Sequence, residues 1–321
     1  MNKLIVVVSF ILLAKVCYGQ NLDQKIEDLL SQMSLTEKIG QMNQYNGFWN
    51  FTGPQPISGD SKKKYDQLRK GLVGSMLNVR GTENVKEVQR IAVEESRLGI
   101  PLLFGFDVIH GYKTQSPIPL AESASWDIKA IERSARLAAL EASSAGLNWT
   151  FAPMVDISRD SRWGRVMEGA GEDPFLASMI ASARVKGFQG NDLSKPNTIL
   201  ACAKHFAGYG YVEAGRDYNT TEISLNTLHN VVLPPFKAAA DSGVGTFMNS
   251  FNDLNGIPST ADKFLQRKIL KELWKFKMEA QGTAPPLIYE YKNKQYFSFL
   301  STGGINDNSK KSSTLYTFSI K

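Results

Sequence analysis

The sequence has 321 residues, of which 42% are hydrophobic and 21% are charged, and its formal net charge is +6. These proportions are ordinary for a soluble globular protein, and the length suits one large domain or two small ones. Apart from Lys62 to Lys64 the basic residues form no run, so the composition does not indicate a nucleic-acid partner.

The first twenty residues have the pattern of a secretory signal peptide. Lys3 gives a positive start, Leu4 to Ala14 is apolar, and the small residue Gly19 precedes Gln20. The apolar run is too short to span a bilayer comfortably, and no other stretch suits a transmembrane helix. We therefore expect residues 1–20 to be a signal peptide, the protein to be periplasmic or secreted, and the membrane not to be a partner.

Cysteine and histidine usage indicates neither a disulfide nor a metal site. Cys202 is the one cysteine outside the predicted signal peptide, so it has no intramolecular partner and is expected in the core. The three histidines, His110, His205 and His229, show no i,i+4 spacing, which a helical metal site would favour. We expect no metal and no cofactor.

The chain begins with helical patterns and then alternates between strands and helices. Residues 21–33 have helical spacing, Ser34 to Glu37 forms a capping box that starts a second helix, and 43–65 is expected to be a loop. The expected strands are 71–79, 101–108, 147–155, 198–206 and 243–251, and the expected helices are 83–97, 126–145, 174–188, 224–240 and 261–276. Such an α/β series implies a parallel sheet with outer helices.

The expected fold is an incomplete TIM-type (β/α) barrel over residues 21–277, because polar residues recur at the strand ends but the strand–helix pairs fall short of eight. After Lys277 the alternation stops. Residues 287–300 are expected to form a short β-hairpin, and 301–313 to be a loose polar segment. We therefore place a boundary near 277 and treat 278–321 as an unrelated tail.

A charged loop follows the third expected strand. Residues 148–173 begin with an apolar run and continue with four aspartates or glutamates and three arginines within Asp156 to Glu172. Arginine suits a binding site because its planar fork holds paired oxygens. The alternative, with about even odds on this stretch alone, is a salt-bridged loop that only shapes the turn.

Several chemically useful side chains stand at the ends of the expected strands. They are Asp107, Arg165, Lys204, His205 and Met248, and in a barrel they would gather on one rim. With the amides of Asn249 and Asn252, their carboxylate, guanidinium, ammonium and imidazole groups hydrogen-bond a polyhydroxylated ligand well. Trp163, Tyr209, Tyr211 and Tyr218 offer aromatic faces for a sugar ring. The alternatives are a turn cap for Asp107, a surface pair for Lys204 and His205, and core packing for Met248.

The ordered motifs in this region resemble glycoside hydrolase family 3, and within it the bacterial periplasmic β-glucosidases. They are Leu35-Thr-Glu-Lys-Ile-Gly-Gln-Met, Phe104-Gly-Phe-Asp-Val-Ile-His-Gly, Ala152-Pro-Met-Val-Asp, Arg162-Trp-Gly-Arg-Val-Met-Glu, Gly171-Glu-Asp-Pro, Ala203-Lys-His-Phe and Met248-Asn-Ser-Phe-Asn. Gly208-Tyr-Gly replaces the histidine loop of the family's hexosaminidases. The resemblance implies a retaining hydrolase of terminal β-D-glucosyl residues, with a β-glucoside or oligosaccharide as substrate.

The resemblance also assigns roles to individual residues. It implies that Asp107, Arg165, Lys204 and His205 hold the hydroxyls of the sugar in the −1 subsite. Met248 would lie near the sugar, with Tyr218 or Asp217 beside it.

The sequence departs from the family where the catalytic nucleophile is expected. The family places an Asp after a glycine, a short apolar run and a serine, whereas this chain reads Met278-Glu-Ala-Gln-Gly-Thr283. Because a retaining glycosidase needs two carboxylates, we expect this chain to be inactive, and a non-catalytic glucoside-binding protein is the alternative. The tail from Gly282 to Tyr296 resembles the end of quinone-dependent sugar dehydrogenases but carries no recognisable quinone site.

Overall fold

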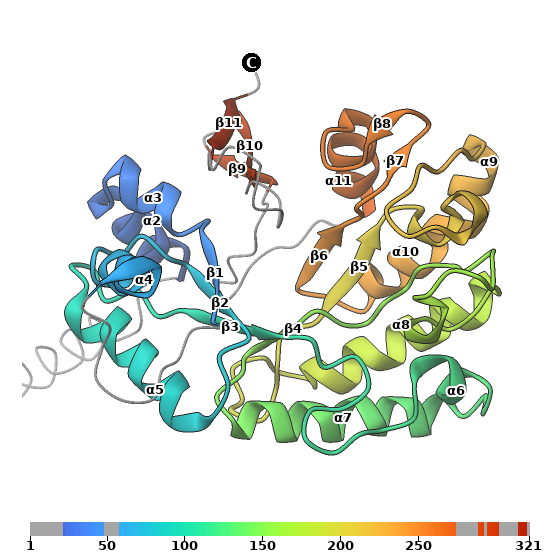
Figure 1. Ribbon diagram of the computed structural model, residues 1–321, viewed down its shortest axis with the longest axis horizontal. Coiled ribbons are helices and arrows are strands. Elements are labelled where there is room, and N and C mark those ends of the chain that lie inside the picture. The colour runs from blue at the N-terminus through green and yellow to red at the C-terminus, as the bar shows by residue number, and fades with distance from the viewer. Residues whose placement is uncertain (1–21, 48–57, 274–287, 292–293, 302–313, 320–321) are drawn as a thin grey trace, which may run out of the picture.

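The computed structural model describes residues 22–47, 58–273, 288–291, 294–301 and 314–319 (Figure 1). The predicted signal peptide, the boundary near 277 and the 278–283 stretch lie outside the described residues. Within the described part of the chain, every helix is too short or too polar to cross a membrane.

The described chain opens with two helices, α2 (Leu22–Gln32) and α3 (Leu35–Gly40). The predicted capping box between them is confirmed. The backbone N–H of Glu37 donates to Ser34 Oγ at 3.2 Å, and the backbone N–H of Ser34 donates to Glu37 Oε2 at 2.8 Å. Two backbone donors that the helix itself leaves free are thereby satisfied, and the start of α3 is fixed.

The expected loop over 43–65 is wrong in part, because it contains β1 (Gln44–Asn46) and the start of α4 (Gly59–Arg69). β1 shows no hydrophobic alternation. It is a strand because its backbone pairs in parallel with β2 (Ser75–Leu77). α4 is mostly polar and presents only Tyr65 and Leu68 to the core. Both elements depend on tertiary partners, which local sequence patterns do not reveal.

A single row of parallel strands organises the described chain. β1, β2, β3 (Leu103–Phe106) and β4 (Trp149–Thr150) pair in that order, and β5 (Cys202–Phe206) pairs in parallel with β6 (Thr246–Asn249). The two groups join through parallel bridges from Trp149 to Leu200 and from Met154 to Lys204. The strands thus follow chain order, as in an incomplete (β/α) barrel.

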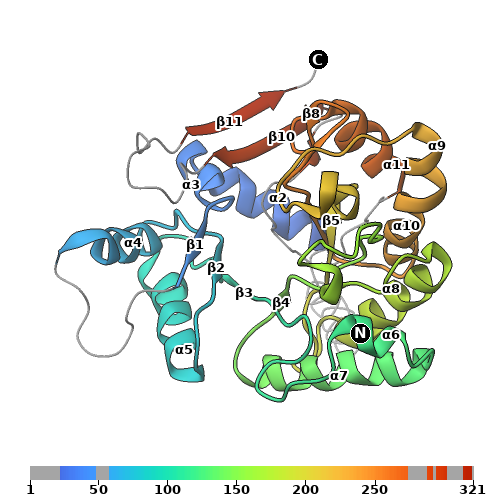
Figure 2. The ribbon, with the colours of Figure 1, turned by 45° about the vertical axis from the view of Figure 1, so that its right-hand side comes forward.

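Helices follow the strands and cover the outside of the row (Figure 1). They are α5 (Thr82–Arg90), which continues to Glu95, α6 (Pro119–Ser123), α7 (Ile128–Ser144), α8 (Pro174–Gln189), α9 (Leu225–Thr227), α10 (Leu233–Asp241) and α11 (Leu270–Leu273). A small antiparallel pair, β7 (Asp253–Leu254) and β8 (Ile257–Pro258), follows β6. Figure 2 shows α4 and α5 beside β1 and β2, and α8 and α10 beside β5.

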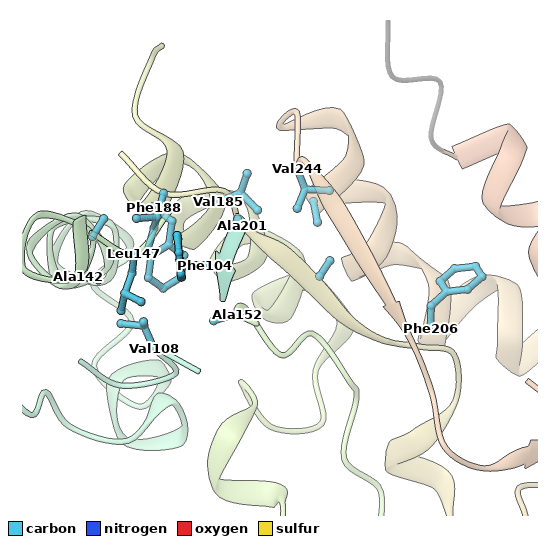
Figure 3. Close-up of a cluster of buried hydrophobic side chains, with 14 of the residues drawn as sticks. Phe104, Val108, Ala142, Leu147, Ala152, Val185, Phe188, Ala201, Phe206 and Val244 are labelled. Carbon is cyan, nitrogen blue, oxygen red and sulfur yellow. The ribbon is translucent and has the colours of Figure 1, made fainter. Parts of the chain in front are cut away.

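The core lies between the strand row and these helices. Figure 3 shows Phe104 of β3, Val185 and Phe188 of α8, and Phe206 of β5 within one buried cluster. α7 and α8 approach each other closely at Gly187, which has no side chain. A Cβ at this position would lie only 2.5 Å from the Glu132 carbonyl oxygen. Burial of the apolar side chains of this core is the main favourable contribution to the stability of such a fold.

The tail forms a separate antiparallel sheet in the order β11-β10-β9. The predicted hairpin is present as β9 (Ile288–Tyr291) and β10 (Lys294–Ser301). The sheet also includes β11 (Thr314–Ser319), which the sequence pattern did not predict and which pairs with β10.

Candidate active site

The centre of the site is the ammonium group of Lys204, on β5. Its side chain is 2% exposed, yet Nζ donates to both carboxylate oxygens of Asp107, at 3.2 and 3.0 Å. Asp107 directly follows β3, and its own side chain is 49% exposed. A buried lysine is costly unless it is paired. Here the pairing fixes the Asp107 carboxylate against the buried ammonium group, while the Asp107 side chain stays half exposed to solvent.

Arg165 and Glu168 form a second pair beside Lys204. Arg165 Nε and Nη2 donate to the two carboxylate oxygens of Glu168 at 2.6 and 2.7 Å, which is the bidentate geometry that arginine favours. Glu168 Oε2 also lies 3.8 Å from Lys204 Nζ. Burial acts to raise the pKa of Glu168, but the Arg165 hydrogen bond and the Lys204 charge outweigh it and leave that pKa lowered.

The same pair keeps Arg165 charged. Burial acts to lower the pKa of Arg165, but the hydrogen bond and charge of Glu168 leave it raised above its usual range. Two cations, Lys204 and Arg165, therefore share the carboxylates Asp107 and Glu168 at one strand edge. Such a network favours ligands that both donate and accept hydrogen bonds.

His205 is fixed by Asp156 from the loop after β4. The His205 backbone N–H donates to Asp156 Oδ2 at 2.9 Å, and His205 Nδ1 lies 2.9 Å from the same oxygen. Both side chains are 1% exposed. Burial lowers the pKa of His205 and outweighs the opposing effect of the Asp156 charge. The imidazole is therefore neutral near pH 7, with its proton on Nδ1 facing the carboxylate.

Aromatic rings line one side of this cluster. The buried Tyr209 contacts His205 and Trp163 edge-on, with centroid distances of 5.1 Å in both cases, and the guanidinium of Arg165 lies 5.7 Å from the centre of its ring. Phe251 and Tyr218 continue this surface outward and are 53% and 66% exposed. Their centroids lie 5.4 Å apart, and that of Phe251 lies 5.5 Å from that of His205.

Two further residues named by the sequence analysis, Met248 and Asp217, have defined contacts in the structure. Met248 lies at the end of β6, beside β5, where its backbone is in register with Lys204. Its side chain packs against Trp149 and Phe151, so the core-packing alternative holds for part of its surface. Asp217 accepts a hydrogen bond from Trp163 Nε1 at 3.0 Å.

The structure thus brings together Asp107, Arg165, Lys204 and His205, as the strand-end pattern predicts. Sequence reasoning missed that Asp156 and Glu168 anchor them, and it did not consider Phe251. In the sequence, Asp156 and Glu168 appear only as members of a charged loop. The alternative that salt bridges merely shape this loop is partly right, because Arg162 Nη2 lies 2.6 Å from Asp160 Oδ2 within it. No cluster of potential metal ligands occurs among the described residues.

Two hollows on the described surface lie elsewhere. One, of about 350 Å³, is lined by residues of α10 and α11, and the other, of about 400 Å³, by residues of α7, α8 and the following loop. Neither includes a residue of the Lys204 cluster. The hydrogen-bond network at the strand ends, rather than the depth of a cavity, therefore locates the candidate site.

The fold and the site define an incomplete (β/α)-barrel domain with a polar cluster at the carboxyl ends of its strands. The sequence profile of the glycosyl hydrolase family 3 N terminal domain matches residues 34–278. The chain belongs to glycosyl hydrolase family 3.

Individual relatives agree with this membership. The periplasmic beta-glucosidase of Salmonella typhimurium is 40% identical over 257 residues, which cover 79% of this chain and 32% of that protein. The crystal structure of the Listeria innocua beta-glucosidase in complex with isofagomine is 41% identical with a TM-score of 0.69, over 78% of this chain and 35% of that one. The exo-1,3/1,4-beta-glucanase of a Pseudoalteromonas species is 31% identical with a TM-score of 0.70, over 79% and 33%. The chain spans about a third of the length of these relatives.

Proposed function

We propose that this chain carries the sugar-binding barrel of a β-glucosidase-type hydrolase that acts on terminal β-D-glucosyl residues. The observation that supports this most directly is the half-exposed carboxylate of Asp107 on the buried ammonium of Lys204. A carboxylate held in this way can accept hydrogen bonds from two neighbouring sugar hydroxyls without moving, and such preorganisation lowers the cost of binding.

The other members of the cluster have complementary tasks in this proposal. Lys204 would donate its remaining N–H to a sugar oxygen, and Arg165 would limit the pocket on the side of Glu168. The tautomer set by Asp156 leaves His205 Nε2 free to accept a hydrogen bond from a hydroxyl. Met248 and Tyr218 would lie against the apolar faces of the ring.

Known relatives support the substrate class and the location. The Salmonella relative is a periplasmic beta-glucosidase, and a Listeria innocua beta-glucosidase has been solved in complex with glucose, at 40% identity. We propose a β-glucoside or oligosaccharide as substrate, residues 1–20 as a signal peptide, a periplasmic or secreted location, and 21–277 and 278–321 as separate units.

A second function, binding without hydrolysis, is favoured by the sequence after Lys277. A retaining mechanism needs a nucleophilic carboxylate and an acid/base carboxylate about 5 Å apart. Met278 to Thr283 contains no Ser-Asp pair where the family has its nucleophile. We therefore propose that this chain, as its sequence stands, binds the sugar with negligible turnover.

Calorimetry with glucose, together with hydrolysis of an aryl β-glucoside, tests both proposals. We expect saturable glucose binding and no burst or steady release of the aryl group. Lys204→Met should weaken glucose binding at least about tenfold, because it removes a charged donor. Lys237→Met, at a pair whose side chains are both 60% exposed, is the control and should not change binding. Equal binding by both variants would refute the site, and turnover like that of an intact relative would refute the inactivity.

A further inference from the structure

The hollow between α7, α8 and the loop that leads to β5 is lined by more basic than acidic side chains. Its volume is about 400 Å³. The charged residues that line it are Arg133, Arg136, Lys186 and Lys195 on the positive side and Glu132 and Asp192 on the negative side. Its lining shares no residue with the Lys204 cluster, so the proposed sugar site does not account for it.

The two carboxylates do not neutralise these cations. Asp192 Oδ2 lies 3.6 Å from Lys195 Nζ, and Asp192 Oδ1 accepts the backbone N–H of Ser194 at 2.9 Å, so this carboxylate is already engaged. Arg133, Arg136 and Lys186 have no ion pair anywhere among the residues that the structure describes. Glu132 is therefore the one carboxylate of the lining left to oppose three cations.

Arg136 gives the hollow a polar group without a partner. Its Nη1 atom is buried, and no group of the described chain accepts a hydrogen bond from it. Leaving a buried charged donor unsatisfied costs free energy, so such a group usually contacts water or an anion. The arginine fork presents several N–H donors in one plane, which matches the oxygens of a carboxylate, sulfate or phosphate.

The backbone holds this arrangement in place. Gly187 lets α8 approach the backbone of α7, because a Cβ there would lie 2.5 Å from the Glu132 carbonyl oxygen and 3.1 Å from the Arg136 backbone nitrogen. At Gly190, where φ is +59°, a Cβ would lie 3.6 Å from Arg136 Nη1. The loop after Gly190 is held by hydrogen bonds within itself, since Thr198 Oγ1 donates to the Lys195 carbonyl at 2.9 Å. Gly187 and Gly190 therefore let α8 and the loop after it pack closely against α7, and this packing fixes the wall of the hollow that they line.

We propose that this hollow is a second binding site, for an oxyanion, with Arg136 as its principal ligand and Lys186 and Arg133 as supporting cations. The shared chemistry is a compact group with two or more negatively charged oxygens. It is met by free phosphate or sulfate and by the carboxylate of an acidic sugar. If the chain binds β-glucosides as proposed above, the second source would hold an acidic sugar unit at a place distinct from the strand-end site.

Isothermal titration with inorganic phosphate and, separately, with glucuronate tests the proposal and distinguishes the two sources. We expect saturable binding of at least one probe and at least about a tenfold loss in Arg136→Gln, because a charge-assisted fork is removed. Arg136→Lys should recover only part of the affinity, since it restores the charge without the fork. Lys186→Gln, at an exposed position, should weaken binding by a smaller factor and does not depend on the fold tolerating a change at Arg136.

Arg267→Gln is the matched control, because it removes the same charge from a helix outside the hollow. The Arg267→Gln variant should bind the probe with the same affinity as the unchanged chain. No saturable binding of either probe would overturn the proposal, and so would equal losses in Arg136→Gln and Arg267→Gln. Glucose binding in the same preparations reports separately on the Lys204 site, so failure of one site is distinguishable from failure of the other.

Discussion

Asp156 Oδ2 accepts two hydrogen bonds from one residue, His205, through its backbone N–H and its Nδ1, both at 2.9 Å. One carboxylate oxygen thus fixes the backbone and the ring of a residue 49 positions later in the chain. Burial lowers the pKa of His205 from its ordinary 6.5. The unfolded chain therefore binds a proton at this histidine more readily than the folded chain does.

We predict that this difference makes stability fall as the pH decreases. The contribution of His205 is fully present above pH 6.5 and is lost as the pH falls from there through the lowered folded-state pKa. The slope in this window should reach about 1.4 kcal/mol per pH unit for one proton. Urea unfolding between pH 5 and pH 8 measures it. His205→Asn should flatten the slope, whereas the exposed His229→Gln should leave it unchanged, and equal slopes in all three proteins would contradict the assignment.

A second prediction concerns the buried pair of Arg184 and Glu122, which are 5% and 8% exposed. Arg184 Nη1 also donates to the Ile109 carbonyl at 3.0 Å, two residues after Asp107. Glu122→Gln should cost about 3–5 kcal/mol in the free energy of unfolding, because the guanidinium stays buried without its counter-charge. Asp241→Asn breaks an exposed pair and should cost less than about 1 kcal/mol. Chemical denaturation compares the two, and similar costs would show that burial does not matter here.

The backbone around Tyr209 supplies a third prediction. A Cβ at Gly210 would lie 2.1 Å from the Ile157 carbonyl oxygen, whereas one at Gly164 would meet nothing within 4 Å. Gly210→Ala should therefore destabilise the protein by about 1–3 kcal/mol and disturb the Arg159 N–H bond to the Gly210 carbonyl. Gly164→Ala should change the melting temperature little. If the two variants melted together, the close approach at Gly210 would not be a constraint.

The exposed rings of Phe251 and Tyr218 predict a binding preference for β-glucosides that carry an aromatic aglycone. Phe251 contacts both His205 and Tyr218 and is 53% exposed, so it can stack on a ring beyond the first sugar. Phe251→Ala should weaken binding of an aryl β-glucoside by about two- to tenfold, the usual worth of one aromatic contact. Glucose, which has no such ring, should bind with nearly the same affinity. A parallel loss for both ligands would place Phe251 at the glucosyl ring instead.

Sequence patterns predicted the α/β series, the incomplete barrel and the set of residues at the strand ends. They succeeded where apolar runs alternate with amphipathic helices, as from β2 to β6, because burial on both faces leaves a clear signal. They failed at β1 and α4, where pairing with β2 and a two-residue contact with the core decide the structure. They also could not show that Asp156 and Glu168 anchor His205 and Lys204, since those contacts join residues 49 and 36 positions apart. The roles of the site residues in binding stay predictions.

Lys204 draws its partners from distant parts of the chain. Asp107 comes from the end of β3, Glu168 from the loop beyond β4, and Lys204 itself from β5. No two of these three groups meet until the strands between them have assembled. A sugar that recognises the completed trio would therefore report on folding, because it would bind the native chain and not partly folded forms. Through mass action it would also shift the population toward the native state.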